Sequence, residues 1–227
     1  MLRAESFQPC HRSPPMRKAI FGEFLGTALM VGVGCGSVAM GASHAVVSLS
    51  FGAVVTLAIV LFGPWSGAHI NPAVSIAFWR DGALQQGRVL PYIGAQCLGA
   101  LCASLLVQGA APTVVDPQLS LLEGFAIEVC ITAVLMVSIL FVVQRTSSRP
   151  AVALWVGATV GLLAFLAGPL TGASMNPART FGPNLLNGLW YTLPFYFTAT
   201  CLGAWLAYDI KQWLFPDTGD VTTEPLS

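Results

Sequence analysis

Two nine-residue stretches decide the fold of this chain: Ser66-Gly67-Ala68-His69-Ile70-Asn71-Pro72-Ala73-Val74 and Thr171-Gly172-Ala173-Ser174-Met175-Asn176-Pro177-Ala178-Arg179. Each contains Asn-Pro-Ala, at 71–73 and at 176–178. Asparagine is a good N-cap, and proline is favoured at the first helical position because its missing N–H is not needed there. Each stretch therefore predicts an unwound segment that leads into a helix. A single Asn-Pro-Ala would indicate only a helix start. Two copies, each preceded by Gly-Pro-x-(Ser/Thr)-Gly-Ala, indicate two equivalent elements with the same function.

The composition indicates that lipid is the solvent of this chain. Of its 227 residues, 55% are apolar and 9% are charged, whereas soluble domains carry about 25% charged residues. This excludes an ordinary cytosolic globule and a disordered chain. The net charge is zero, so we expect a lipid bilayer and no nucleic acid as partner.

Apolar segments predict six membrane-spanning helices, since each span needs roughly 20 apolar residues. They lie at about 19–41, 45–63, 89–108, 121–143, 151–168 and 190–210. Two further apolar segments, about 69–79 and 174–187, are too short to cross, and each contains Asn-Pro-Ala, so we expect re-entrant half-helices there. The expected organisation is a flexible tail at 1–16, a single channel domain at 17–214 and a second flexible tail at 215–227.

The chain contains an internal repeat with an odd number of spans. A shift of 105 residues lays Glu23 on Glu128 and Asn71-Pro72-Ala73 on Asn176-Pro177-Ala178. The repeats cover about 17–110 and 119–214, with three spans each. The second copy must therefore enter the membrane from the opposite side. The predicted fold class is an all-α membrane protein with an inverted 3+3 repeat, whose functional site lies at the midplane where broken helices meet.

Two helix N-termini that meet inside the membrane create a positive focus, because each carries about half a positive charge. Cations and hydronium are repelled there. Neutral molecules that bear hydroxyl groups can accept hydrogen bonds from the side-chain amides of Asn71 and Asn176. The unwound residues, expected at 66–70 and 171–175, present carbonyl groups along the same route, which is tolerated only where they line a wet cavity.

Basic residues predict the orientation. Nine of the ten Lys and Arg residues precede the first span, follow the sixth, or lie between spans two and three and spans four and five. The opposite loops, around 42–44 and 109–120, contain none. By the positive-inside rule, both termini are cytoplasmic and the chain lies in the cell (plasma or inner) membrane. The tenth basic residue is Arg179.

Over about 17–214, the chain resembles the aquaporin (major intrinsic protein) family, whose two signature loops are similar to 66–74 and 171–179. The resemblance implies six tilted helices and two half-helices around a narrow pore, and a homotetramer. It also implies passive passage of water or small neutral solutes.

The resemblance also implies a narrow outer filter. Arg179, three residues after Asn176, matches the family's filter arginine, and an intramembrane arginine should face a cavity because its burial in lipid costs a few kcal/mol. Phe51, Ala164 and Ala173 fall on the remaining filter positions. Water-selective members usually have His and Cys or Thr where this chain has alanines, so we expect a wider opening.

Three other polar residues near the signature loops need a role. Glu23 and Glu128 each lie forty-eight residues before the asparagine of their own half. A proton relay is conceivable, but we favour carboxyl groups that accept hydrogen bonds from backbone N–H groups of the unwound loop. His69 has no partner at metal-ligand spacing, so we expect a hydrogen-bonded brace and neither a metal site nor a cofactor. We also expect Gly94, Gly99 and Gly203 to allow close helix contacts.

The leading functional hypothesis is a passive channel for water, with capacity for glycerol, urea or other small uncharged solutes, that excludes protons and ions. The alternatives are a proton-coupled secondary transporter of a small solute and a non-conducting membrane scaffold. The sequence contains no nucleophile–base pair, metal cluster or phosphate loop, so we do not expect an enzyme. The preference between water and the larger solutes stays open at this point.

Overall fold

The computed structural model describes residues 14–215, and its regular structure is helical throughout. The predicted tails fall almost wholly outside the described residues, and the first helix already begins at Met16. The elements are α1 (Met16–Ala39), α2 (His44–Ser66), α3 (Pro72–Arg80), α4 (Gln86–Leu106), α5 (Leu121–Arg145), α6 (Arg149–Thr171), α7 (Pro177–Leu186), the short 3-10 helix η1 (Trp190–Thr192) and α8 (Leu193–Leu214).

The long helices correspond to the six predicted spans. Five of them, α1, α2, α4, α5 and α6, are long and apolar enough to cross a membrane. The sixth, α8, has 22 residues, which at 1.5 Å per residue is about the thickness of a bilayer core. It is less apolar than the others because tyrosine, threonine and Asp209 lie among its residues.

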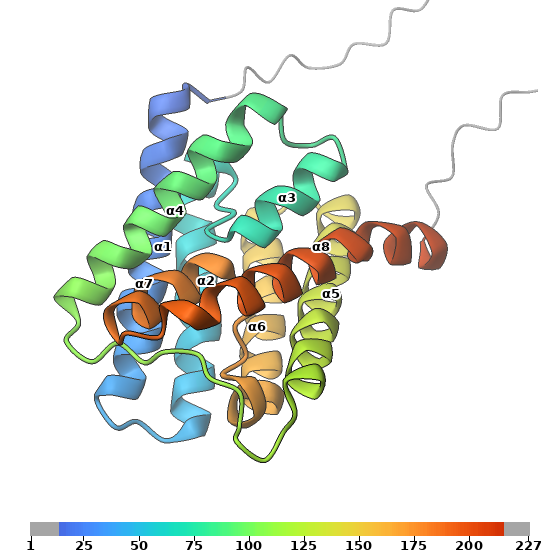
Figure 1. Ribbon diagram of the computed structural model, residues 1–227. Coiled ribbons are helices and arrows are strands. Elements are labelled where there is room, and N and C mark those ends of the chain that lie inside the picture. Colours follow the sequence, from blue (N-terminus) through green and yellow to red (C-terminus); the bar gives the residue numbers. More distant parts are fainter. Residues whose placement is uncertain (1–13, 216–227) are drawn as a thin grey trace, which may run out of the picture.

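The two halves of the chain run in opposite directions through the molecule. In Figure 1, α1 begins at the upper face, whereas α5 begins at the lower face, after the 107–120 connection has crossed there. Within the first half α1 packs against α2 and α4, and within the second half α5 packs against α6 and α8. The short helices α3 and α7 contact each other between the halves. This arrangement is an inverted repeat with one half-helix in each copy.

Equivalent glycines bring the helices of each half close together. A Cβ added to Gly99 of α4 would lie 2.3 Å from the Phe24 carbonyl oxygen of α1, and one added to Gly203 of α8 would lie 2.4 Å from the Val129 carbonyl oxygen of α5. No heavy atom lies within 4 Å of such a Cβ at Gly94. The expectation of a close contact at Gly94 was therefore wrong, because that glycine faces away from the neighbouring helix.

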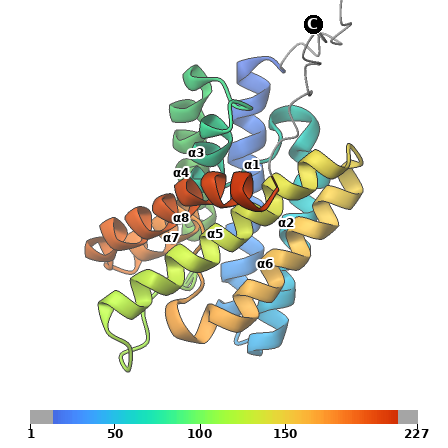
Figure 2. The ribbon, with the colours of Figure 1, turned by 90° about the vertical axis from the view of Figure 1, so that its right-hand side faces the viewer.

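The two halves join where α2 crosses α6. A Cβ on Gly52 would lie 2.7 Å from the carbonyl oxygen of Gly157, and a Cβ on Gly157 would lie 2.4 Å from that of Gly52. The two glycines are equivalent positions of the repeat, so the closest approach falls near the axis that relates the copies. Figure 2 shows α2 and α6 together on the right of the molecule, while α5 runs diagonally across it and crosses α8.

Helices α2 and α6 extend three residues beyond the predicted spans, through Pro64 and Pro169. The sequence ranges stop at the glycine before each proline, because a proline removes the hydrogen bond to the carbonyl four residues earlier and its ring crowds that carbonyl. In α6 that carbonyl belongs to Phe165, and its oxygen lies 2.8 Å from the His44 Nε2 atom instead. The unwound segments consequently begin at Gly67 and Gly172, one residue later than expected.

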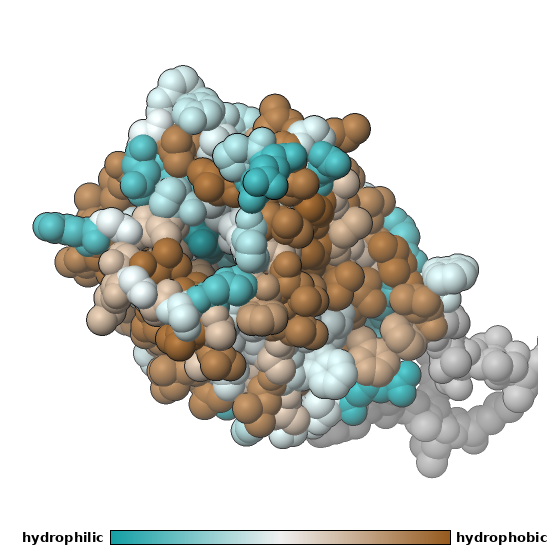
Figure 3. All heavy atoms as spheres, turned by 90° about the horizontal axis from the view of Figure 1, so that it is seen from below, coloured by the Kyte–Doolittle hydropathy of each residue, from teal (hydrophilic) through white to brown (hydrophobic). Residues whose placement is uncertain are grey.

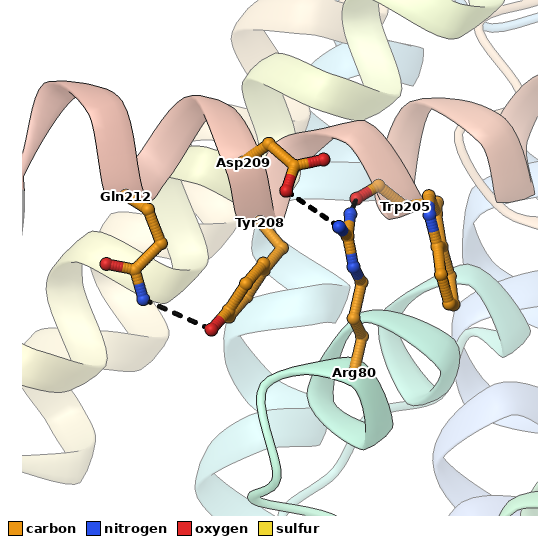
Figure 4. Close-up of polar contacts among 5 residues, drawn as sticks. All are labelled: Arg80, Trp205, Tyr208, Asp209 and Gln212. Carbon is orange, nitrogen blue, oxygen red and sulfur yellow. Dashed lines mark hydrogen bonds and ion pairs between the residues drawn. The ribbon is translucent and has the colours of Figure 1, made fainter.

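An arginine joins the end of the first half-helix to α8. The Arg80 Nη2 atom lies 2.7 Å from an Asp209 carboxylate oxygen, and Nη1 donates to the carbonyl oxygen of Trp205. The guanidinium carbon lies 4.4 Å from the centroid of the Trp205 ring and 4.9 Å from that of Tyr208 (Figure 4). Arg80 is in the last turn of α3, where a cation also interacts favourably with the helix dipole.

Candidate pore

The two signature loops share an unusual backbone conformation. Four residues other than glycine have positive φ: Ala68 (50°) and Ile70 (46°) in the first loop, and Ala173 (41°) and Met175 (51°) in the second. Each such conformation costs of order 1–3 kcal/mol and persists only where the surroundings hold it. The same pattern at equivalent positions of both halves indicates that the loops are held by equivalent contacts.

Two buried carboxyl groups supply those contacts. Glu23 of α1 accepts hydrogen bonds from the backbone N–H groups of His69 (2.9 Å) and Ile70 (2.6 Å). Glu128 of α5 accepts them from Ser174 (2.8 Å) and Met175 (3.0 Å). Both glutamates are fully buried. Each carboxyl group thus lies against two consecutive amides of the loop in its own half of the chain.

Further polar side chains complete each carboxyl site. Gln96 Nε2 donates to Glu23 at 2.7 Å, whereas the Thr171 hydroxyl donates to Glu128 at 2.6 Å. Two tyrosines hydrogen-bond to the last residues of α2 and α6. The Tyr92 hydroxyl donates to the Ser66 carbonyl at 2.9 Å, and the Tyr196 hydroxyl donates to the Thr171 carbonyl at 2.8 Å. The two tyrosines are 104 residues apart, as are Gly99 and Gly203 of the same two helices, so the sequence held a signal for them.

The asparagines of the two motifs bridge the halves. The Oδ1 atom of Asn71 caps α3 by accepting from Ala73 N at 2.8 Å, and the Oδ1 atom of Asn176 caps α7 by accepting from Ala178 N at 2.9 Å. Asn71 Nδ2 donates to the carbonyl of Met175 at 2.8 Å, and Asn176 Nδ2 donates to the carbonyl of Ile70 at 2.9 Å. Each NH₂ group has two hydrogens, so one hydrogen of each amide fixes the opposite loop.

One cavity runs along both loops. It has a volume of about 590 Å³ and is lined by both motif asparagines, by apolar side chains of α2, α5 and α6, and by the 107–120 connection at one end. Figure 3 views the face that carries this connection and shows a hollow with hydrophilic atoms inside it. The asparagines that cap the two half-helices therefore border the same cavity.

All four predicted filter residues line this cavity. The guanidinium carbon of Arg179 lies 5.3 Å from the centroid of the Phe51 ring, which is a cation–π distance. Ala164 and Ala173 line the same cavity and present only methyl groups to it. Arg179 is only 5% exposed, and its Nη1 atom donates to the carbonyl of Ala111 at 3.0 Å.

The side chain of His69 borders the cavity in the first half. Its Nδ1 atom lies 3.1 Å from the Ser75 hydroxyl. The ring stacks on Phe78, with 4.8 Å between centroids, and meets Tyr92 edge-on at 5.3 Å. His69 is thus braced by a hydrogen bond and two rings while one side faces the cavity. Among the described residues no cluster of His, Cys, Asp or Glu has the geometry of a metal site.

Sequence reasoning missed several residues at this site. The Ala111 carbonyl, which holds Arg179, could not be found because every residue has a carbonyl and only folding selects one. Asn184 and Asn187 of α7 bind the same connection and were not singled out. His44 was passed over although its 105-residue partner, Arg149, also begins a helix and packs against the equivalent glycine.

These features define a polytopic membrane channel with inverted repeats and two half-helices at its centre. The major intrinsic protein family matches residues 11–211, so the chain belongs to that family. Proteins of this family are channels and not enzymes. The fold of the chain is accordingly the aquaporin fold.

Individual relatives agree with this assignment. The chain is 36% identical over 223 residues to the glycerol uptake facilitator protein of Pseudomonas aeruginosa, covering 82% of this chain and 80% of the relative. It is 34% identical over 220 residues to Aquaporin-4 of Mus musculus, covering 88% and 68%. The X-ray structure of the aquaglyceroporin from Plasmodium falciparum superposes with a TM-score of 0.81 at 26% identity, covering 89% of this chain and 98% of that one.

Proposed function

We propose that this chain is a passive channel for both water and small uncharged solutes such as glycerol and urea, and that it excludes protons and ions. The observation that carries the proposal is the filter: Arg179 lies against Phe51, while the other two predicted filter positions are Ala164 and Ala173, which line the same cavity. Selectivity in aquaporin-type channels depends on pore diameter, lining hydrogen-bond groups and positive charge. A passage bordered by two methyl groups leaves more room for a polyol than one bordered by histidine and threonine.

The asparagine bridge supports the exclusion of protons. Asn71 and Asn176 each use one amide hydrogen on the opposite loop, and the Asn176 Nδ2 atom also donates to the Met30 sulfur at 3.6 Å. Asn71 therefore retains one hydrogen for a passing oxygen, and Asn176 can donate its second hydrogen to such an oxygen in place of the sulfur, which is a weak acceptor. The half-helix N-termini behind them carry positive partial charge. A water or hydroxyl group held there accepts hydrogen bonds, whereas a cation meets repulsion.

A proton-coupled transporter is less well supported. Neither Glu23 nor Glu128 is among the residues that line the cavity, and in each carboxyl group both oxygens accept hydrogen bonds from loop amides. A relay residue needs access to the transported species. A non-conducting scaffold is disfavoured by a cavity of about 590 Å³ that contains Arg179.

We further propose that residues 17–214 form one channel domain that assembles as a homotetramer, with both termini cytoplasmic in the cell membrane. Large apolar side chains, including Leu49, Leu57, Leu162 and Leu166, are exposed on the outer faces of α2 and α6. Such faces suit lipid or another subunit. Mass measurement of the detergent-solubilised protein tests the assembly, and a monomer would contradict it.

Stopped-flow light scattering of proteoliposomes tests the function. Vesicles that contain the protein should shrink faster than bare vesicles after a sucrose jump, and should re-swell faster in glycerol and in urea. Proton leak, followed with a pH dye under a potassium-valinomycin potential, should stay at the level of bare lipid. Water and glycerol permeabilities equal to those of bare lipid would refute a channel. Glycerol flux that follows an imposed proton gradient would support the transporter instead.

A further inference from the structure

The filter arginine is held by a connection that is itself held by α7. Within residues 14–215 no carboxylate forms an ion pair with Arg179. Its polar partner is the Ala111 carbonyl, 3.0 Å from Nη1, in the 107–120 connection between the two repeats. Because N–H···O hydrogen bonds span about 2.7–3.2 Å and a separation of about 3.6 Å no longer forms one, a shift of that carbonyl by less than 1 Å would release the guanidinium.

Asn184 binds this connection with a pair of hydrogen bonds. Its Oδ1 atom accepts from the Thr113 backbone N–H at 2.8 Å, and its Nδ2 atom donates to the Thr113 backbone carbonyl, also at 2.8 Å. The second amide hydrogen is used by the Thr192 hydroxyl at 2.8 Å. Asn184 and Thr113 are both fully buried, so water cannot replace these bonds.

A second asparagine holds the other side of Ala111. Asn187 Nδ2 donates to the Ala110 carbonyl at 3.1 Å. Asn184 lies in the last turn of α7, and Asn187 is the C-cap residue that directly follows Leu186. The connection is therefore fixed one residue before Ala111 and two residues after it, by the same helix that carries Arg179.

We propose that Asn184 is a positioning residue for the filter: through Thr113 it fixes the Ala111 carbonyl, and through that carbonyl it sets where the Arg179 guanidinium stands. This inference rests on the proposed function. An arginine side chain carries about 2 kcal/mol of rotamer entropy, so without a fixed acceptor it samples several positions. The width of the passage between Phe51 and the alanines then varies, and discrimination against larger solutes falls.

The test compares the ratio of glycerol to water permeability in four proteins reconstituted in parallel. Asn184→Asp keeps the shape and the acceptor for Thr113 N–H but removes both donors. Of the two lost bonds, the one to the Thr113 carbonyl holds the connection. We therefore expect the ratio to rise roughly three- to tenfold, the factor that loss of one hydrogen bond produces in an equilibrium. Asn187→Ala, at an exposed helix end, should raise the ratio in the same direction by a smaller factor.

Thr113→Val is the matched control. The two 2.8 Å bonds to Asn184 use backbone groups of Thr113, so valine retains both. It removes the Thr113 hydroxyl, with its longer 3.3 Å bond to Asn184 Oδ1 and its 2.9 Å contact with the Thr180 hydroxyl. A general loss of packing would affect this variant as well. We expect its permeability ratio to equal that of the wild type.

The outcomes separate this inference from the proposed function. If the wild type conducts neither water nor glycerol, the proposed function fails before any variant is compared. If the wild type conducts both and folded Asn184→Asp leaves the ratio unchanged or lower, the positioning role is refuted. If Asn184→Asp does not fold, the Asn187→Ala protein decides. A glycerol-to-water permeability ratio that is unchanged or lower in Asn187→Ala refutes the positioning role. A ratio that rises as much in Thr113→Val as in Asn187→Ala refutes it too.

Discussion

Replacing Glu128 with glutamine tests whether the buried carboxyl groups hold the loops or move protons. Glu128 accepts hydrogen bonds at both oxygens, from Thr171 Oγ1 and Ser174 N at one oxygen and from Met175 N at the other. Glutamine has one oxygen and one NH₂ group. Whichever way the glutamine amide is turned, its NH₂ group faces at least one of the three groups that donate to the carboxylate in the wild type.

The magnitude follows from that mismatch. A buried donor left without an acceptor costs about 1–3 kcal/mol. The change leaves two such donors facing each other, one from the loop and one from the new amide, so we expect Glu128→Gln to lose about 2–6 kcal/mol of stability. For a chain of this size each kcal/mol lowers Tm by about 2–4 °C, which gives a fall of about 4–24 °C.

The assay is thermal unfolding in detergent, followed by intrinsic fluorescence, together with water permeability per inserted channel. Glu123→Gln is a matched control on the same helix, because Glu123 accepts bonds only from Ser120 in an exposed capping box. Its Tm should change less than that of Glu128→Gln. A Glu128→Gln protein with the Tm of the wild type would refute the structural role. If that protein also lost flux driven by a proton gradient, the transporter hypothesis would gain support.

Two other predictions concern the cavity and its outer end. The double change Ala164→His with Ala173→Thr should narrow the passage and reduce glycerol flux roughly tenfold more than water flux, as measured in the vesicle assay; equal losses of both would contradict the width argument. His44→Phe keeps a ring against Phe165 but leaves the carbonyl that Pro169 has freed without its donor. It should lower Tm by roughly 2–4 °C, and His44→Gln, which retains a donor, should recover most of that loss. Equal Tm values for the two variants would count against the hydrogen bond.

Much of the fold followed from periodic features of the sequence. Apolar stretches located the six long helices, and the 105-residue shift made the second half an inverted copy of the first. The motif asparagines marked the starts of α3 and α7 because Asn-Pro specifies a capped helix start from local chemistry alone. Helix ends were less certain. Helix α6 continues through Pro169, and the Phe165 carbonyl that loses its N–H partner there pairs with His44, which lies 121 residues earlier in the chain.

Residue types alone determined that the chain belongs in lipid, that it has two half-helices and that it carries an arginine in the membrane. Those properties depend on hydropathy, capping and charge, which are local. The tertiary structure decided which groups meet: Asn71 reaches Met175 and Asn176 reaches Ile70, and Arg179 lies between Phe51 and the Ala111 carbonyl. Such pairings depend on backbone atoms that every residue has. Only the packing of one half against the other selects which of them line the passage.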